Sequence, residues 1–233
     1  MTDATTLASG IPVYLEIGTR RTFAGAVDWP GWCRSGRDET TALEALLSYG
    51  PRYARVVETI HPDMELPGSA SDFFITERLT GNSTTDFGAP GAIPTADADG
   101  RCREIDPAEF DRLAALLGAG WQAFDRAVAG AHGKPLRKGP RGGGRDLTGI
   151  IQHVADANRA YLARLAWKPA TDLGANPLSL VNQMLDENLK AVAAAAAGDL
   201  PSKGPRGGRL WAPRYFVRRV AWHVLDHAWE IED

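Results

Sequence analysis

The sequence has few of the residues that mark several common protein classes. Among its 233 residues only Cys33 and Cys102 are cysteines, and they do not form a CxxC pair. This spacing excludes a disulfide framework and a cysteine zinc knuckle. No apolar run approaches the roughly 18 residues of a membrane helix, and the start MTDATTLASG lacks the pattern of a secretion signal. We therefore expect a cytoplasmic protein without membrane contact.

The net charge of the chain excludes binding to nucleic acid through overall electrostatic attraction. The formal net charge is -3, so the chain as a whole does not attract nucleic acid, and any basic function has to be local. Apolar residues make up 44% and charged residues 24% of the chain, which is the composition of an ordinary globular protein with a sizeable core.

The first part of the chain, residues 1–100, changes its pattern every few residues and predicts a small α+β domain. The expected strands cover residues 13–17, 22–27 and 73–79, and the expected helices run from Asp38 to about Gly50-Pro51 and over 52–60. Residues 80–103 are rich in Gly, Pro, Asp, Ser and Thr, and they predict a long irregular connection.

Residues 101–233 predict a second, helical domain. Four helices of similar length are expected over about 106–131, 146–167, 176–197 and 213–233, with Asp106 and Asp146 as N-caps. Their number and length favour an up-down four-helix bundle, so the predicted fold class is a two-domain α+β chain.

Three of the five histidines fall on apolar helix faces. His223 and His227 have the i, i+4 spacing that places two imidazoles on one face, about 5 to 6 Å apart. His153 lies on the face of its own helix, near Ala157 and Tyr161. In an up-down bundle these two helices are parallel and place the three rings at similar depth. Burying three imidazoles together favours a divalent metal site, whereas His61 and His132 lie at predicted turns.

The segments Gln152-His153-Val154-Ala155-Asp156-Ala157 and His223-Val224-Leu225-Asp226-His227 resemble those of the DinB/YfiT-like superfamily. This resemblance implies a four-helix bundle over residues 106–233 in which His153, His223 and His227 hold zinc or nickel. Residues 1–100, with the turn Asp28-Trp29-Pro30-Gly31, are similar to HicB-like folds.

Characterised DinB-like relatives include mycothiol-dependent maleylpyruvate isomerase and thiol S-transferases. The resemblance therefore implies an enzyme that activates a small thiol or water, with mycothiol as a candidate cosubstrate and a small electrophile as its partner. Three neutral ligands also leave a coordination position open, as in catalytic sites. The alternative is a metal-binding regulatory or partner-binding protein without catalysis. The sequence is also compatible with a homodimer.

Carboxylates near the histidines suggest further roles. Asp156 and Asp226 are candidates for orienting the imidazoles, although Asp156 could instead pair with Arg159. Glu230 follows His227 by three residues and is the candidate catalytic base, with an exposed carboxylate as the other interpretation.

A basic hexapeptide occurs twice, as Lys138-Gly139-Pro140-Arg141-Gly142-Gly143 and as Lys203-Gly204-Pro205-Arg206-Gly207-Gly208. Each copy precedes a histidine-bearing helix, so parallel helices would bring both to one end of the bundle. Arg141 and Arg206 are then candidate binding residues for an anionic substrate, while ordinary solvated turns are the other interpretation.

Overall fold

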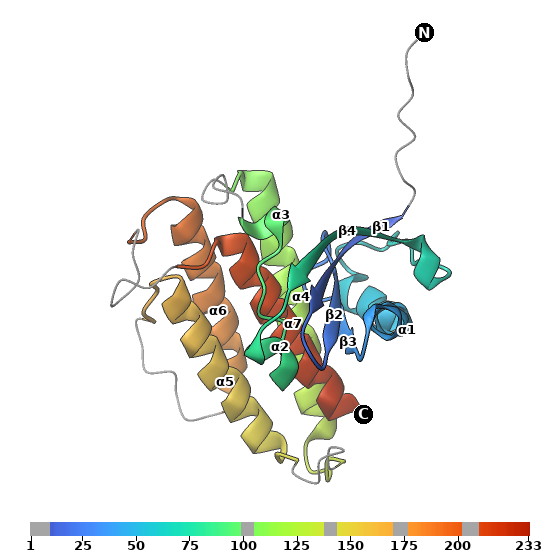
Figure 1. Ribbon diagram of the computed structural model, residues 1–233. Coiled ribbons are helices and arrows are strands. Elements are labelled where there is room, and N and C mark those ends of the chain that lie inside the picture. Colours follow the sequence, from blue (N-terminus) through green and yellow to red (C-terminus); the bar gives the residue numbers. More distant parts are fainter. Residues whose placement is uncertain (1–9, 99–104, 138–143, 170–176, 202–209) are drawn as a thin grey trace. The chain divides into compact units, whose positions relative to one another are not determined.

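The computed structural model describes residues 10–98, 105–137, 144–169, 177–201 and 210–233 and shows a mixed α+β protein. The chain forms two compact units, residues 1–94 and residues 95–233. A four-stranded sheet lies in the first unit, and the long helices α4 to α7 lie in the second (Figure 1). The α+β class expected from the sequence is confirmed.

The sheet of the first unit contains β1 (Ile11–Ile17), β2 (Thr22–Ala26), β3 (Cys33–Gly36) and β4 (Phe73–Thr80) in the order β3-β2-β1-β4. β1 is antiparallel to β2 and parallel to β4. The sequence did not predict β3, because its four residues include Arg34 and Ser35 and show no apolar alternation.

Helix α1 (Glu39–Val57) corrects the expected end at Gly50-Pro51, because it continues through Pro51. Its start follows the sequence, since the Asp38 carboxylate accepts the Thr41 backbone N–H at 2.8 Å. Leu46 and Tyr53 are buried on either side of the proline. Their packing offsets the hydrogen bond that a proline removes from a helix interior.

The segment expected to be irregular contains two short helices, α2 (Ser83–Phe87) and α3 (Thr95–Ala98), and a 3-10 turn, η1 (Ala70–Asp72), precedes β4. Glu16 on β1 is fully buried and accepts the backbone N–H groups of Gly91 at 2.8 Å and Ala92 at 3.0 Å. A buried carboxylate needs such donors, so the interaction holds this connection against the sheet.

The second unit contains four long helices, α4 (Pro107–Ala131), α5 (Leu147–Arg164), α6 (Pro177–Ala196) and α7 (Pro213–Glu232). The predicted N-caps are confirmed, because the Asp106 carboxylate accepts the Glu109 N–H and the Asp146 carboxylate accepts the Gly149 N–H. Among the described residues no helix is both long enough and apolar enough to cross a membrane.

The directions of these helices differ from the up-down expectation. Near the start of α7, the backbone N–H of Trp211 donates to the carbonyl of Arg164, at the end of α5, at 2.9 Å. His227, near the end of α7, lies beside His153 in the first half of α5, with ring centroids 4.9 Å apart. α5 and α7 are therefore antiparallel, and the expectation that they are parallel is wrong.

The other helix pairs complete the topology. α4 and α7 start together, where Arg214 pairs with Glu109, and their last turns line one cavity, so they are parallel. α5 and α6 are also parallel, because Ile151 shares a small void with Leu180 while Asn158, further along α5, bonds to Asn188 at 3.0 Å. A connection between parallel helices has to span their length, and the interval from Arg164 to Pro177 is long enough for that.

Candidate metal centre

Three imidazoles converge between α5 and α7. The ring centroids of His223 and His227 are 4.6 Å apart, and His153 lies 5.2 Å from His223 and 4.9 Å from His227. Each ring offers one nitrogen, and these nitrogens lie within 4.8 Å of one another. The three histidines that the sequence singled out therefore form one cluster.

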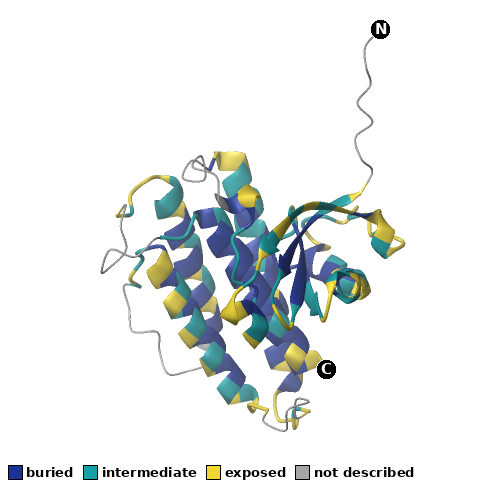
Figure 2. Ribbon diagram, in the orientation of Figure 1, coloured by how far each residue is buried: buried dark blue, intermediate teal, exposed yellow. Residues whose placement is uncertain are grey.

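Local structure explains the convergence. The i, i+4 spacing places His223 and His227 on one face of α7, and both are buried with 6% and 8% of their surface exposed. Most of α7 is buried along its length (Figure 2). Because α5 runs in the opposite direction, the histidine in its first half meets the C-terminal half of α7. The predicted cluster is present, although the parallel geometry used to predict it is wrong.

The donor set fits a tetrahedral ion. Zinc bonds imidazole nitrogen at about 2.0 to 2.1 Å, so two ligand nitrogens in a tetrahedron are about 3.3 Å apart. The nitrogens here, within 4.8 Å of one another, need shifts of about 1 Å or less to reach that spacing. Side-chain rotation of that size requires no change in the helices, so the site can hold one divalent ion.

Glu230 supports one of the rings. Its Oε2 lies 2.5 Å from Nδ1 of His227, and its side chain is 45% exposed. A hydrogen bond from Nδ1 to this carboxylate leaves Nε2 of His227 free to bind a metal. The sequence predicted Glu230 as a base at the open position; the structure places its carboxylate against the His227 ring, where it can orient that ring.

The two aspartates, Asp156 and Asp226, were the predicted orienting residues. The Asp156 carboxylate accepts from Gln152 at 2.9 Å and pairs with Arg159 at 2.6 Å, which is the alternative that the sequence left open. Asp226 is half-buried on α7. Neither lies in the compact group of possible metal ligands found among the described residues.

The surroundings favour the metal-binding form of the rings. Burial lowers the pKa of His223 well below its ordinary value, and the nearby His227 and Arg219 lower this pKa further. Burial also lowers the pKa of His153. The hydrogen bond to His227 lowers the pKa of Glu230, although partial burial opposes this. Near neutral pH the rings of His153 and His223 are therefore neutral, and Glu230 is ionised.

Aromatic side chains and an arginine lie next to His223. Tyr161 makes an edge contact with His223 at 5.5 Å, and Arg219 lies over the rings of Tyr161 and Trp222 at 5.4 and 4.7 Å. Burial raises the pKa of Tyr161, and Arg219 opposes this rise, so the hydroxyl stays protonated. Arg219 was missed from the sequence, although it precedes His223 by one helical turn.

The helix directions do not support the expectation that both basic hexapeptides lie at one end of the bundle. Arg141 and Arg206, with both copies of the hexapeptide, lie outside the described residues. The helix starts that follow them, at Asp146 and Ala212, belong to antiparallel helices and lie at opposite ends of the pair. Among the described residues, the charge of Arg145, beside the start of α5, acts on His153, His223 and Glu230.

Glu230→Gln is expected to weaken zinc binding by about 10- to 100-fold, as for other carboxylates that orient a ligand histidine. The neutral amide is a poorer acceptor for Nδ1–H of His227. Competition titration with a chromogenic chelator measures the change. Glu232→Gln, also on the last turn of α7, is the matched control, and equal affinities in the two variants would remove the orienting role.

Comparison with known proteins adds no relative to this description: no protein-family model, no curated protein and no solved structure matches the chain.

Proposed function

We propose that the helical unit is a metal-dependent enzyme of the DinB-like thiol S-transferase or isomerase type. In this proposal His153, His223 and His227 hold one zinc or nickel ion, and a small thiol such as mycothiol, or a water molecule, is activated there. The observation that carries the proposal is the convergence of three imidazoles, two of them buried, without a fourth protein ligand among the described residues.

The ligand set supports catalysis rather than a structural role. Structural zinc sites use four protein ligands, whereas catalytic sites commonly use three and leave a position for water or substrate. Three neutral imidazoles leave the double charge of the ion uncompensated. A bound ion of this kind supplies Lewis acidity that lowers the pKa of a coordinated thiol or water.

The chain's own groups complete the site. Glu230 holds the His227 ring in the tautomer that presents Nε2. Tyr161, next to His223, is a protonated hydroxyl that can donate a hydrogen bond to a substrate oxygen or leaving group. Trp222, which is buried, contacts both His223 and Arg219 on that side.

The test separates metal binding from chemistry. We expect elemental analysis to find one zinc or nickel ion per chain, and the cobalt-substituted protein to develop a thiolate charge-transfer band with the thiol that it uses. Mycothiol, bacillithiol and glutathione are then each incubated with the protein and monochlorobimane or an epoxide, and conjugation above the protein-free rate is measured. His132→Ala, an exposed histidine, is the control variant.

Two outcomes would contradict the proposal in different ways. Absence of bound metal would remove the site itself. Metal binding without a charge-transfer band, and without conjugation or isomerisation, would favour a regulatory metal-binding protein.

A further inference from the structure

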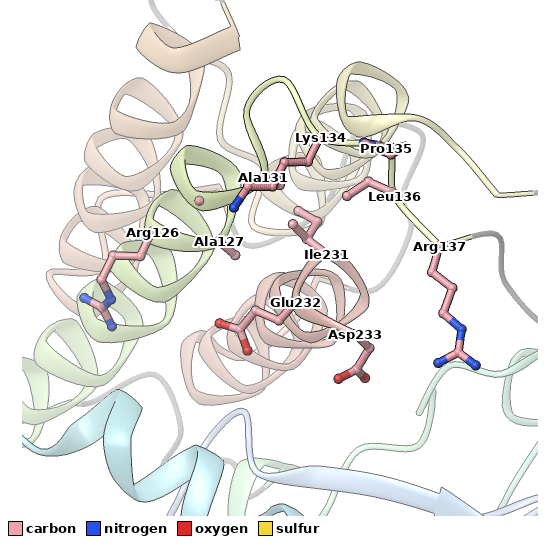
Figure 3. A pocket seen from close by; sticks show the side chains of 11 residues that line it. Arg126, Ala127, Ala131, Lys134, Pro135, Leu136, Arg137, Ile231, Glu232 and Asp233 are labelled. Carbon is pink, nitrogen blue, oxygen red and sulfur yellow. The ribbon is translucent and has the colours of Figure 1, made fainter.

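The helical unit contains a second site, at the end of the bundle where α4 and α7 both finish. A cavity of about 630 Å³ opens there. Its walls come from the last turns of α4, the segment that follows α4, and the last residues of α7 (Figure 3). Cavities of about 300 to 1,000 Å³ are the size that small-molecule ligands occupy.

The path of the chain after α4 builds one wall. Gly133 has a φ of 73°, a left-handed conformation that glycine adopts without strain and that ends helices. The chain turns there, and residues 134–137 line the cavity beside α4. Ile231 on α7 faces the same space and follows His227 by one helical turn, about 6 Å along the helix axis.

The lining combines apolar surface with basic groups. The apolar part comes from Ala127, Ala131, Pro135, Leu136 and Ile231. Three basic side chains line the same cavity: Arg126, Lys134 and Arg137. A ligand that matches both kinds of surface has a hydrocarbon part and a negative charge.

The charged groups differ in whether they already have partners. Glu232 and Asp233 also line the cavity, and both already interact with other groups. Within the described part of the chain, the side chains of Arg126, Lys134 and Arg137 make no hydrogen bond or ion pair. Helix C-termini attract cations, which explains a basic residue near Gly133. Arg126, more than one turn before the end of α4, is not explained in this way.

We propose that this cavity binds a small organic anion, with its carboxylate or sulfonate against basic side chains of the cavity wall and its apolar part against Leu136 and Ile231. Arginine and lysine both form charge-assisted hydrogen bonds to such oxygens. The inference does not depend on the proposed function, because binding is measured on the protein both with and without metal.

Gly130 provides a way to block the cavity. It lines the cavity on α4, and an added Cβ would meet no atom within 4 Å. Gly130→Phe therefore adds a ring at a position that lines the cavity and has space for the new Cβ, and it replaces a helical glycine with a better helix former. Gly118 on the same helix is also free of neighbours at its Cβ position and does not line the cavity, so Gly118→Phe is the matched control.

The experiment titrates the full chain, with and without added zinc, with 8-anilinonaphthalene-1-sulfonate and follows its fluorescence. We expect saturable binding to the parent and to Gly118→Phe, and at least about tenfold weaker binding to Gly130→Phe, because the ring displaces the ligand. The triple variant Arg126→Gln, Lys134→Gln, Arg137→Gln should lose at least about tenfold, since it removes the charge-assisted contacts. Arg20→Gln, Arg37→Gln, Arg55→Gln, an equal charge change in the first unit, should bind normally.

Competition defines the ligand class. Benzoate should displace the dye, while benzylamine should not, and inorganic phosphate should be weaker than benzoate. Circular dichroism and thermal unfolding verify that each variant is folded, because the dye also binds partly unfolded chains. Unchanged binding in Gly130→Phe or in the basic triple variant, absence of binding by the parent, or displacement by benzylamine would overturn the proposal.

Discussion

Replacing His223 and His227 together with alanine is expected to abolish stoichiometric zinc binding. Each imidazole is one of three possible ligands, and the pair comes from a single helix face. Losing a carboxylate that merely orients a ligand costs about 10- to 100-fold in affinity, so losing two ligands should cost more than about 1,000-fold. Competition with a chromogenic chelator and elemental analysis after dialysis measure this loss.

The control for this double variant is His132→Ala, which removes an exposed histidine after α4 and should keep the parent's metal content. His153→Ala alone tests whether α5 contributes to the same ion, and it should also release the metal. Full retention of one zinc per chain by the double variant would show that the metal binds elsewhere. Thermal unfolding of the metal-free proteins separates loss of ligands from loss of fold.

The second large effect is expected from the buried ion pair between α3 and α7. Arg218 Nε lies 2.5 Å from Asp97 Oδ2, and the two side chains are only 8% and 3% exposed. Asp97→Ala leaves the buried guanidinium without this carboxylate. Removing one partner of a buried pair costs about 3 to 5 kcal/mol, so the free energy of unfolding should fall by about that amount.

Chemical denaturation followed by tryptophan fluorescence measures the change, since α7 contains Trp222 and Trp229. The double variant Asp97→Leu, Arg218→Met removes both charges and should lose much less than Asp97→Ala. Asp186→Ala, which breaks an exposed pair with Lys190, should change stability little. If Asp97→Ala were as stable as Asp186→Ala, the buried pair would have no special role in holding α3 on α7.

Much of the helical unit could be read from local patterns. The four long helices lie within a few residues of the predicted ranges, and Asp106 and Asp146 cap α4 and α5 as expected. Caps and apolar periodicity are local signals, so they do not depend on the rest of the fold. In the first unit, β3 and the passage of α1 through Pro51 were missed, because both depend on packing against neighbouring elements.

For the candidate metal centre, too, some features followed from the sequence and others did not. The sequence alone determined that His223 and His227 share one face of a helix, because the i, i+4 spacing fixes this in any α-helix. It also indicated that His153 lies on a face near small and aromatic residues. These features were sufficient to identify the three residues that the structure brings together.

Only the tertiary structure decided from which direction α5 approaches α7 and which groups surround the histidines. Apolar periodicity is the same whichever way a helix runs, so helix direction depends on long-range contacts such as Trp211 with Arg164. Because α5 and α7 are antiparallel, their two starts lie at opposite ends of the pair, and Arg145 acts on the histidines. The cavity at the end of α4 and α7 is lined by residues that belong to no motif recognised in the sequence. The contact between Glu230 and His227 likewise depends on side-chain geometry, which the spacing of three residues permits but does not require.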